Sequence, residues 1–334
     1  MGEPILSIRG LNVSYAGSTQ MVRVLRDLNL DLLSNAITGI AGESGSGKTT
    51  LANTVLNILP LAATVESGSV TFQGKDLLKL DYDGLRSIRG KLISYVPQSA
   101  MNSLNPVRRI KDDFFDIMKA HGIDPDSNLG SIYGTLELVD LDRSILGSYP
   151  HELSGGMRQR AIIAISLVLS PELIIVDEPT TGLDVIVQHD ILKALKGARK
   201  AKSLSIVFIT HDLPLLYQLA DHIVVLYGGV VLEYGTYEKL LNDADHPYSY
   251  LLLKSVPSLV KRTKKLVTIP GDPVSFRDYP NGCPFAPRCP FALEMCSERL
   301  PPATYTDSSV DGSPFFFRCF RSPEWKKEIK SVEV

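Results

Sequence analysis

Residues 42–49 decide the fold, and they read Gly42-Glu43-Ser44-Gly45-Ser46-Gly47-Lys48-Thr49. This stretch fits G-x-x-x-x-G-K-[ST], a glycine-rich loop whose backbone N–H groups wrap phosphates at the start of a helix. In that pattern Lys48 reaches the β- and γ-phosphate oxygens, and the hydroxyl of Thr49 ligates Mg²⁺. The apolar run 37–41 precedes the loop as a strand would, and helical spacing follows it up to Pro60. The sequence therefore predicts a nucleotide site between a strand and a helix.

A second glycine motif, at residues 153–157, reads Leu153-Ser154-Gly155-Gly156-Met157. A serine and two glycines at the start of a helix form another terminus that favours anions. One chain needs a single cradle for the γ-phosphate, so we expect this second cradle to contact a nucleotide held by a partner subunit. The alternative is a simple helix N-cap by Ser154, the first interpretation if the pentapeptide stood alone.

An acidic pair follows the apolar run 173–176. Asp177 ends that run, where a buried strand carboxylate would hold Mg²⁺ directly or through water. Neighbouring side chains of a strand project to opposite faces, so Glu178 is expected to face the γ-phosphate and polarise the attacking water. The alternative, an ordinary acidic strand end, is weak beside a matching phosphate loop.

The composition of the 334 residues is that of a globular protein, with 44% hydrophobic residues for a core. The 35 basic and 37 acidic residues leave a net charge of −2, which gives no general field for nucleic acid or an anionic lipid surface. We therefore expect no nucleic-acid partner. Residues 1–10 alternate like a strand rather than a signal peptide, and the longest mostly apolar run, 161–169, is far shorter than the roughly 20 residues that cross a bilayer. Any membrane role is expected to be peripheral.

Apolar periodicity predicts the arrangement around these motifs. Residues 5–13 and 22–32 alternate as half-buried antiparallel strands do. Later short apolar runs, separated by helical stretches, predict parallel strands at 173–176, 204–209 and 222–226. The whole pattern predicts an α/β fold with an N-terminal antiparallel β subdomain, a parallel-sheet core and a helical insertion at about residues 99–170.

The composition shifts near Pro257, where a basic linker, 261–265, precedes a proline-rich tail. We predict two domains on this basis. The first is a nucleotide-binding domain at residues 1–256. The second is a small C-terminal module at residues 257–334 that contains every cysteine of the chain.

The four cysteines are Cys283, Cys289, Cys296 and Cys319. Their clustering has three interpretations: two disulfides, a Cys₄ zinc site or an iron–sulfur cluster. A cytoplasmic location argues against disulfides. Zinc sites usually show close C-x₂-C pairs, whereas the spacing here is C-x₅-C-x₆-C with a distant fourth cysteine, which suits a larger cuboidal cluster better. Zinc, and free or regulatory thiols, stay open as alternatives.

These motifs, in this order, make residues 5–245 similar to the nucleotide-binding subunits of ATP-binding-cassette (ABC) transporters. The resemblance implies that Tyr15 stacks on adenine, Gln98 is the Q-loop that senses Mg²⁺, Asp184 belongs to the D-loop 182–184, and His211 is the switch histidine. The residues implied to contact ATP are Tyr15, Gly42, Ser44, Gly45, Ser46, Gly47, Lys48, Thr49, Thr50, Ser154, Gly155, Gly156 and Asp184. Mg²⁺ would be held by Thr49, Gln98 and Asp177, and the catalytic set would be Lys48, Gln98, Glu178 and His211.

Two of these assignments keep simpler alternatives. A tyrosine in a first hairpin, such as Tyr15, is commonly a core or rim residue. A lone histidine at a strand end, such as His211, is more often a satisfied polar terminus than a γ-phosphate ligand. In the family, two subunits pack head to tail with ATP between the phosphate loop of one and residues 153–157 of the other, and closure pulls on membrane subunits.

Three segments resemble one branch of the family more closely, the oligopeptide and dipeptide importers: residues 96–106, 149–160 and 246–248. Met157 is similar to the D-type subunit of that branch, which pairs with a homologous F-type subunit. The resemblance implies a nucleotide-sandwich dimer with an F-type subunit or with a second copy, two transmembrane permease subunits, and indirectly a substrate-binding protein. It places the chain at the cytoplasmic face of the cell membrane.

The resemblance also bears on the cargo and on the tail. It implies an ATPase that drives import of di- and oligopeptides, with nickel or oligosaccharide import, or a soluble non-transport ABC ATPase, as alternatives. A further alternative is an iron–sulfur-dependent regulator or scaffold that uses ATP only as a structural ligand. The tail resembles the C-terminal extension of the oligopeptide branch, some members of which look able to bind a [4Fe–4S] cluster through such cysteines.

Overall fold

The computed structural model describes residues 4–17, 20–98, 100–255, 268–276, 279–306 and 315–331. The chain divides into two compact units, each assembled from separate stretches of sequence. The first unit comprises Met1–Leu33, Thr38–Leu78 and His211–Val334, and the second comprises Ser34–Ile37 and Lys79–Thr210. The predicted domain boundary at 256–257, the predicted linker 261–265 and Ser99 at the start of the predicted insertion lie outside the described residues.

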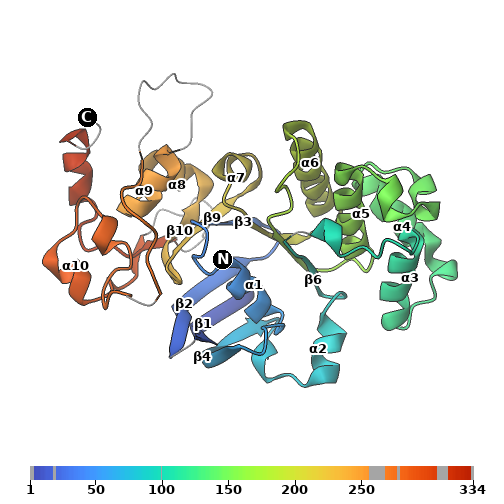
Figure 1. Ribbon diagram of the computed structural model, residues 1–334, viewed down its shortest axis with the longest axis horizontal. Coiled ribbons are helices and arrows are strands. Elements are labelled where there is room, and N and C mark those ends of the chain that lie inside the picture. Colours follow the sequence, from blue (N-terminus) through green and yellow to red (C-terminus); the bar gives the residue numbers. More distant parts are fainter. Residues whose placement is uncertain are drawn as a thin grey trace. The chain divides into compact units, whose positions relative to one another are not determined.

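The first unit contains the predicted antiparallel subdomain, a four-stranded sheet in the order β2-β1-β4-β5 (Figure 1). Its strands are β1 (Pro4–Ala16), β2 (Met21–Leu33), β4 (Ala63–Phe72) and β5 (Lys75–Asp76). Every pairing in it is antiparallel. Alternation along β1 buries Leu6 and Ile8, and then, after a register shift between Ile8 and Leu11, Leu11 and Val13.

A second sheet in the first unit carries the phosphate loop, with strand order β11-β12-β10-β9-β3. These strands are β3 (Ile37–Ala41), β9 (His222–Tyr227), β10 (Val230–Thr236), β11 (Thr304–Thr306) and β12 (Phe315–Phe317). β3 and β9 are parallel, and every residue of both is buried, which explains their unbroken apolar character. The turn from β9 to β10 needs Gly229, because a Cβ there would lie 1.9 Å from the carbonyl oxygen of Val24.

The helices of the first unit are short. They are α1 (Lys48–Val55), α7 (Leu213–Leu219), α8 (Tyr237–Asp243), α9 (Pro247–Lys254) and α10 (Glu294–Glu298). The predicted helix after the phosphate loop was expected to reach Pro60, but α1 ends at Val55. Asn57, two residues later, has a left-handed backbone with φ 51°, which does not continue a right-handed helix.

The second unit holds three parallel strands in the order β8-β7-β6. They are β6 (Ile93–Val96), β7 (Leu173–Asp177) and β8 (Ser205–Ile209), of which β6 was not predicted. The helices are α2 (Tyr82–Ile88), α3 (Ile110–Ala120), α4 (Leu129–Leu138), α5 (Gly155–Leu167) and α6 (Val185–Lys202). Between β6 and β7 the chain is helical, as expected, and α3, α4 and α5 lie together in Figure 1.

Short 3₁₀ helices occupy Leu77–Lys79, Ala100–Asn102, Asp126–Asn128, Arg143–Gly147, Pro150–Glu152, Ala286–Arg288 and Glu324–Ser331. Within the described ranges, every helix is too short or too polar to cross a membrane.

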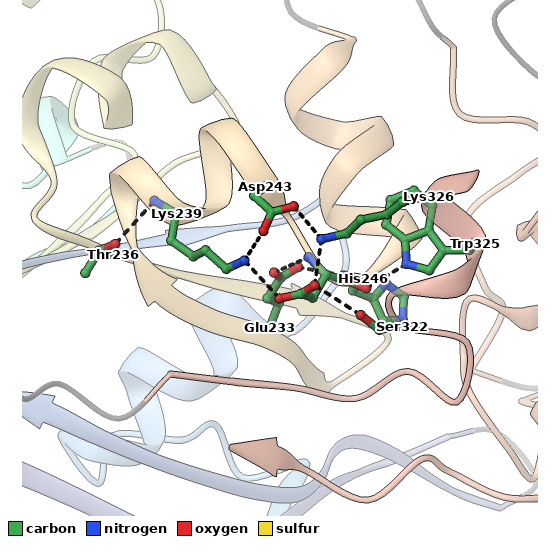
Figure 2. Close-up of polar contacts among 9 residues, drawn as sticks. Glu233, Thr236, Lys239, Asp243, His246, Ser322, Trp325 and Lys326 are labelled. Carbon is green, nitrogen blue, oxygen red and sulfur yellow. Dashed lines mark hydrogen bonds and ion pairs between the residues drawn. The ribbon is translucent and has the colours of Figure 1, made fainter. Parts of the chain in front are cut away.

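The C-terminal segment, meaning the described residues from 268 to 331, joins the first unit through β12, which pairs with β10. Figure 2 shows a second attachment, where charged side chains of α8 meet the end of the chain. Lys326 Nζ lies 2.6 Å from a carboxylate oxygen of Asp243 and 2.7 Å from one of Asp245. Trp325 is fully buried and donates from Nε1 to the Asp245 carbonyl oxygen, at 2.9 Å. The segment is therefore packed onto the unit that contains the phosphate loop.

A buried carboxylate organises the chain beneath this attachment (Figure 2). Glu233, on β10, is fully buried and accepts the backbone N–H groups of Asp245 and His246 at 2.7 and 3.0 Å. Burial raises the pKa of Glu233 to about 7, although these hydrogen bonds oppose the rise. Two backbone donors just ahead of α9 are thus satisfied by a side chain from another element.

Candidate functional site

The phosphate loop is closed on itself by its own lysine. Lys48 is buried, with 6% of its surface exposed, and its Nζ donates to the carbonyl oxygens of Gly42 and Glu43 at 2.8 and 2.9 Å. The helix that starts here, α1, has Gly47 as its N-cap, with φ 103° and no side-chain cap. A helix start without a side-chain cap, next to a buried lysine, is an arrangement that suits a phosphate site.

Two glycines of the loop, Gly42 and Gly47, are required for different reasons. A Cβ at Gly42 would lie 2.1 Å from the carbonyl oxygen of Leu226, so the loop passes against β9 at a distance that only glycine permits. Gly47 has a backbone φ of 103°, which other residues rarely adopt.

Tyr15, at the exposed end of β1, lies beside the same helix start. Its hydroxyl is 3.3 Å from Oγ1 of Thr50, in the first turn of α1. The structure therefore brings Tyr15 together with the phosphate loop, as an aromatic residue at the rim of the predicted site.

The second predicted cradle, in the second unit, begins α5. Ser154 is exposed and caps the helix, its Oγ accepting the N–H of Met157 at 3.2 Å. Gly156 is the point where α5 packs on α6, because a Cβ there would lie 2.5 Å from Val187 Cγ1. Both interpretations of this motif are thus compatible with its geometry: Ser154 is an N-cap, and the exposed helix start can meet a further acceptor.

Asp177 is the last residue of β7 and is completely buried. The hydroxyl of Tyr95, on the neighbouring strand β6, lies 3.5 Å from one of its carboxylate oxygens. Burial and the nearby Asp177 charge raise the pKa of Tyr95, so it stays a neutral hydrogen-bond donor.

Glu178 lies outside the strand, contrary to the expected alternation. β7 ends at Asp177, and Glu178 has a left-handed backbone with φ 47°. Its carboxylate accepts the Gln98 amide at 3.0 Å and the Thr181 hydroxyl at 3.3 Å. The orientation of Glu178 therefore comes from a turn and from two polar neighbours. Thr181 was not predicted, although its place between the acidic pair and the D-loop is a usable signal.

The D-loop residues precede α6. Asp184 is exposed and caps that helix, accepting the N–H groups of Ile186 and Val187, each at 3.0 Å. Val185 and Ile186 are 78% and 76% exposed, an unusual position for large apolar side chains. His211 is exposed and lies two residues before α7 in the first unit.

The predicted residues divide between the units. Tyr15, the phosphate loop, Thr50 and His211 belong to the first, whereas Gln98, Ser154, Gly155, Gly156, Asp177, Glu178 and Asp184 belong to the second. Among the described residues, no group of three or more His, Cys, Asp or Glu side chains is placed to hold a metal ion.

The four cysteines are all reduced and lie in the first unit. Burial above all, and the neighbouring thiols to a smaller extent, raise the pKa of Cys283 and Cys289 to about 12 and that of Cys319 to about 11. The backbone N–H of Cys283 donates to the Cys296 carbonyl at 2.7 Å, and Gly282 makes this approach possible, since a Cβ there would lie 2.1 Å from that oxygen. The fold thus gathers thiols that the sequence separates.

Sequence reasoning missed two residues that bond the phosphate loop and a third that bonds one of these two. Arg288 bonds the side chain of Glu43, Tyr248 accepts the Glu43 N–H, and Tyr227 bonds Arg288. No local pattern marks them, because they lie 61 to 245 residues from their partners.

Comparisons with known proteins agree with this geometry. Residues 25–181 match the family described as ABC transporter, and residues 232–296 match the family described as Oligopeptide/dipeptide transporter, C-terminal region. The fold is similar to that of MJ0796, an ATP-binding cassette solved as a dimer in a post-hydrolysis state with ADP and Pi. The TM-score is 0.62 at 24% identity, over 69% of this chain and 98% of that one.

Sequence relatives cover nearly the whole chain. It is 38% identical to the dipeptide transport ATP-binding protein DppD of Caldanaerobacter subterraneus, over 89% of this chain and 92% of that protein. It is 40% identical to the oligopeptide transport ATP-binding protein OppD of Haemophilus influenzae, over 88% and 91%. The chain therefore belongs to the ATP-binding proteins of ABC transporters, in the branch with the oligopeptide/dipeptide transporter C-terminal region.

Proposed function

We propose that this chain is the ATP-hydrolysing subunit of an importer, and that it couples MgATP binding and hydrolysis in a sandwich dimer to uptake of di- and oligopeptides. Three observations together carry the proposal. The helix start at Gly47 has no side-chain cap, the exposed helix start at Ser154 has one, and the chain matches the C-terminal region of the peptide branch. The names of the sequence relatives, dipeptide and oligopeptide transport proteins, support the choice of cargo.

In this proposal the phosphate loop binds the nucleotide by exchange. Lys48 leaves the carbonyl oxygens of Gly42 and Glu43 for the β- and γ-phosphates, while the N–H groups of Ser44, Gly45, Ser46, Gly47, Thr49 and Thr50 surround them. Thr49 contributes its hydroxyl to Mg²⁺, with Asp177 and Gln98. Tyr15 stacks on the adenine, for which its place beside Thr50 is suitable.

Hydrolysis then depends on Glu178. Gln98 and Thr181 both donate to its Oε2 and orient the carboxylate. A carboxylate accepts about four hydrogen bonds, so Glu178 can also polarise the attacking water. Gln98 thereby links Mg²⁺ sensing to the general base. His211 bonds the γ-phosphate, and Lys48 stabilises the charge that develops on the transferring phosphoryl group.

The partners follow from the split between the two cradles. Ser154, Gly155, Gly156 and Asp184 contact the nucleotide of a partner, either a homologous F-type subunit or a second copy. The exposed Val185 and Ile186 then become buried in the dimer. Two permease subunits receive the motion through the helical insertion, a substrate-binding protein delivers the cargo, and the chain works peripherally at the cytoplasmic face of the membrane.

Uptake of labelled substrates tests this function. Cells of the organism that makes this protein, with Glu178→Gln introduced into the chain, should lose uptake of radiolabelled di- and tripeptides. They should keep uptake of nickel and of oligosaccharides. Glu238→Gln, an exposed carboxylate of α8, is the matched control and should keep peptide uptake. Unchanged peptide uptake in Glu178→Gln cells would contradict the cargo, and loss of nickel or oligosaccharide uptake alone would replace it.

We further propose that Cys283, Cys289, Cys296 and Cys319 hold a [4Fe–4S] cluster. Four thiolates are the donor set of such clusters; Cys283 is buried and the other three cysteines are half-buried. The sulfur of Cys296 accepts the backbone N–H of Leu293 at 3.4 Å, and hydrogen bonds to ligating sulfurs are common in such clusters. When bound, the cluster would supply a covalent cross-link of the segment. Zinc is the alternative, and for either group the thiols would have to draw closer, because no compact set of ligands is present among the described residues.

Metal analysis of protein purified without oxygen decides this point. We expect roughly four iron and four sulfide per chain and a broad absorbance near 400 nm. Stoichiometric zinc without colour would assign a zinc site instead, and neither metal would leave free thiols.

A further inference from the structure

The second residue of the phosphate loop, Glu43, is held by the C-terminal segment. Arg288 NH1 lies 2.7 Å from one carboxylate oxygen of Glu43, and NH2 donates to the other at 3.2 Å. The two side chains are only 7% and 21% exposed. This is a two-point arginine–carboxylate pair between residues 245 positions apart, a geometry that fixes orientation as well as distance.

Arg288 is itself fixed on its other sides. Its Nε donates to the carbonyl oxygen of Pro270 at 2.6 Å, and NH1 also donates to the hydroxyl of Tyr227 at 3.0 Å. The same hydroxyl accepts the N–H of Val274 at 3.1 Å. A guanidinium with its donors bound in this way has little freedom to leave Glu43.

An aromatic cluster supports both ends of the contact. Tyr227, Tyr248 and Phe285 are fully buried, and their ring centroids lie 4.5 to 5.5 Å apart. The hydroxyl of Tyr248 accepts the backbone N–H of Glu43 at 3.1 Å. The loop residues Glu43 to Ser46 line a small cavity together with Pro273 and Val274 of the C-terminal segment. One wall of the phosphate loop is thus built from the tail of the chain.

The charge of Glu43 makes this support relevant to nucleotide binding. The residue's carbonyl oxygen accepts a hydrogen bond from Lys48, so its backbone is part of the cradle. A carboxylate next to a polyphosphate repels it, and the repulsion is strongest where water is excluded. Arg288 cancels that charge and draws the carboxylate toward the tail.

We propose that Arg288 is a positioning residue for MgATP: it neutralises Glu43 and holds it in place, so that the C-terminal segment sets the shape and charge of the phosphate loop. The inference rests on the ATP-binding role proposed above and is independent of the cargo, the partner subunits and the occupant of the cysteines.

The test measures equilibrium binding of MgATP to the purified full-length chain. The readout is the displacement of a bound fluorescent ATP analogue by MgATP. Arg288→Gln should weaken binding about tenfold, the size expected for one disrupted buried contact. Arg288→Lys keeps the charge without the two-point geometry, so its affinity should lie between those of wild type and Arg288→Gln, about threefold weaker than wild type. Adding Glu43→Gln to Arg288→Gln should restore affinity to within about threefold of wild type, because the uncompensated carboxylate is gone.

Arg321→Gln is the matched control, since it breaks an ion pair with Glu328 within the same segment and should leave affinity within about twofold. Thermal unfolding checks that each variant is folded. If Arg288→Gln is not folded, the MgATP affinities of Arg288→Lys and of Arg288→Lys with Glu43→Gln are compared instead. Wild-type affinity in Arg288→Gln, or no restoration by Glu43→Gln, would overturn the inference. A wild-type chain that binds no MgATP would instead contradict the proposed function.

Discussion

Two helix starts in this molecule use glycine and serine in opposite ways. At α1 the N-cap is Gly47, no side chain caps the helix, and the loop is held by Lys48 bonding its own carbonyl oxygens. At α5 the N-cap is Ser154, whose hydroxyl already satisfies the N–H of Met157. The first start has a buried lysine in place of a side-chain cap, whereas the second has one N–H group satisfied by its own serine.

This difference between the two helix starts indicates how strongly each can bind phosphate. An uncapped start with an adjacent buried lysine binds phosphate strongly within one chain. A capped and exposed start adds a weaker contact, suited to a nucleotide that another subunit already holds. Disruption of α1 should therefore abolish binding, whereas disruption of α5 should affect only steps that need the dimer.

The largest expected effect comes from Glu178→Gln, which leaves both helix starts intact. Removal of the carboxylate should lower ATP turnover about a thousandfold, because the water is no longer polarised, while MgATP still binds. Both starts would then hold the same nucleotide in a trapped closed dimer. Phosphate release and size-exclusion chromatography with MgATP measure the two effects. Sustained turnover would remove Glu178 from the mechanism.

The next effect breaks the α1 side of the comparison. Lys48→Ala should weaken MgATP binding about a hundredfold, since a charge-assisted contact to the phosphates is lost. Titration with a fluorescent nucleotide measures it. Lys202→Ala is the control: that amine also bonds a carbonyl oxygen, at Leu167, but lies far from the phosphate loop in sequence and should bind normally. Equal affinity in the two variants would contradict the role of Lys48.

A third helix start, that of α9, differs from the other two because its stabilising contact should depend on pH. Glu233 satisfies the N–H groups ahead of α9, and burial raises its pKa from 4.5 to about 7. The folded chain therefore keeps a proton that the unfolded chain loses between pH 4.5 and 7, so stability falls as pH rises through that window. We expect a loss of about 3 kcal/mol in the free energy of unfolding.

Urea unfolding of the wild type and of Glu233→Gln at pH 5 and pH 8 measures this loss as the difference between the two proteins, because His246, whose pKa burial lowers to about 3, gives the opposite pH dependence in both. Asp245, Ser249 and His246 are the groups that act on Glu233, and all of them are retained in the variant. The same pH dependence in both proteins would assign it to other groups.

The smallest effect tests the α5 side. Ser154→Ala should lower the free energy of unfolding by about 1 kcal/mol through the lost cap. It should also slow hydrolysis by the dimer while MgATP binding to the single chain is unchanged. Thr236→Ala removes an equivalent cap from α8, where Thr236 accepts the N–H of Lys239 at 3.3 Å, and should cost similar stability with normal hydrolysis. Equal hydrolysis in the two variants would reduce Ser154 to an N-cap.

The sequence predicted the parts of the fold that depend on short-range patterns. β3 was predicted at its observed bounds, because an unbroken apolar run led into a loop with a fixed glycine pattern. The antiparallel subdomain was predicted from alternation along β1 and β2. β6 was missed, since four residues carry too little periodicity to be recognised.

The site was less predictable where geometry depends on turns and on distant residues. The types of Asp177 and Glu178 indicated their chemistry, but strand alternation failed for Glu178 because its backbone turns left-handed at the strand end. The contact between Arg288 and Glu43 joins residues 245 positions apart and has no local signal. It is visible only in the structure, where Tyr227 packs on Phe285 and accepts a hydrogen bond from Arg288.

Trp325 gives the molecule an optical probe of its own. It is the single tryptophan of the chain, and it is fully buried against Phe291 and Tyr250 with its indole N–H bound to the Asp245 carbonyl. Its emission should therefore be blue-shifted while the tail is seated and should move to the red when water reaches the indole. When light that the 13 tyrosines do not absorb excites the indole selectively, the fluorescence of the unlabelled protein reports on this one contact between the tail and the rest of the first unit.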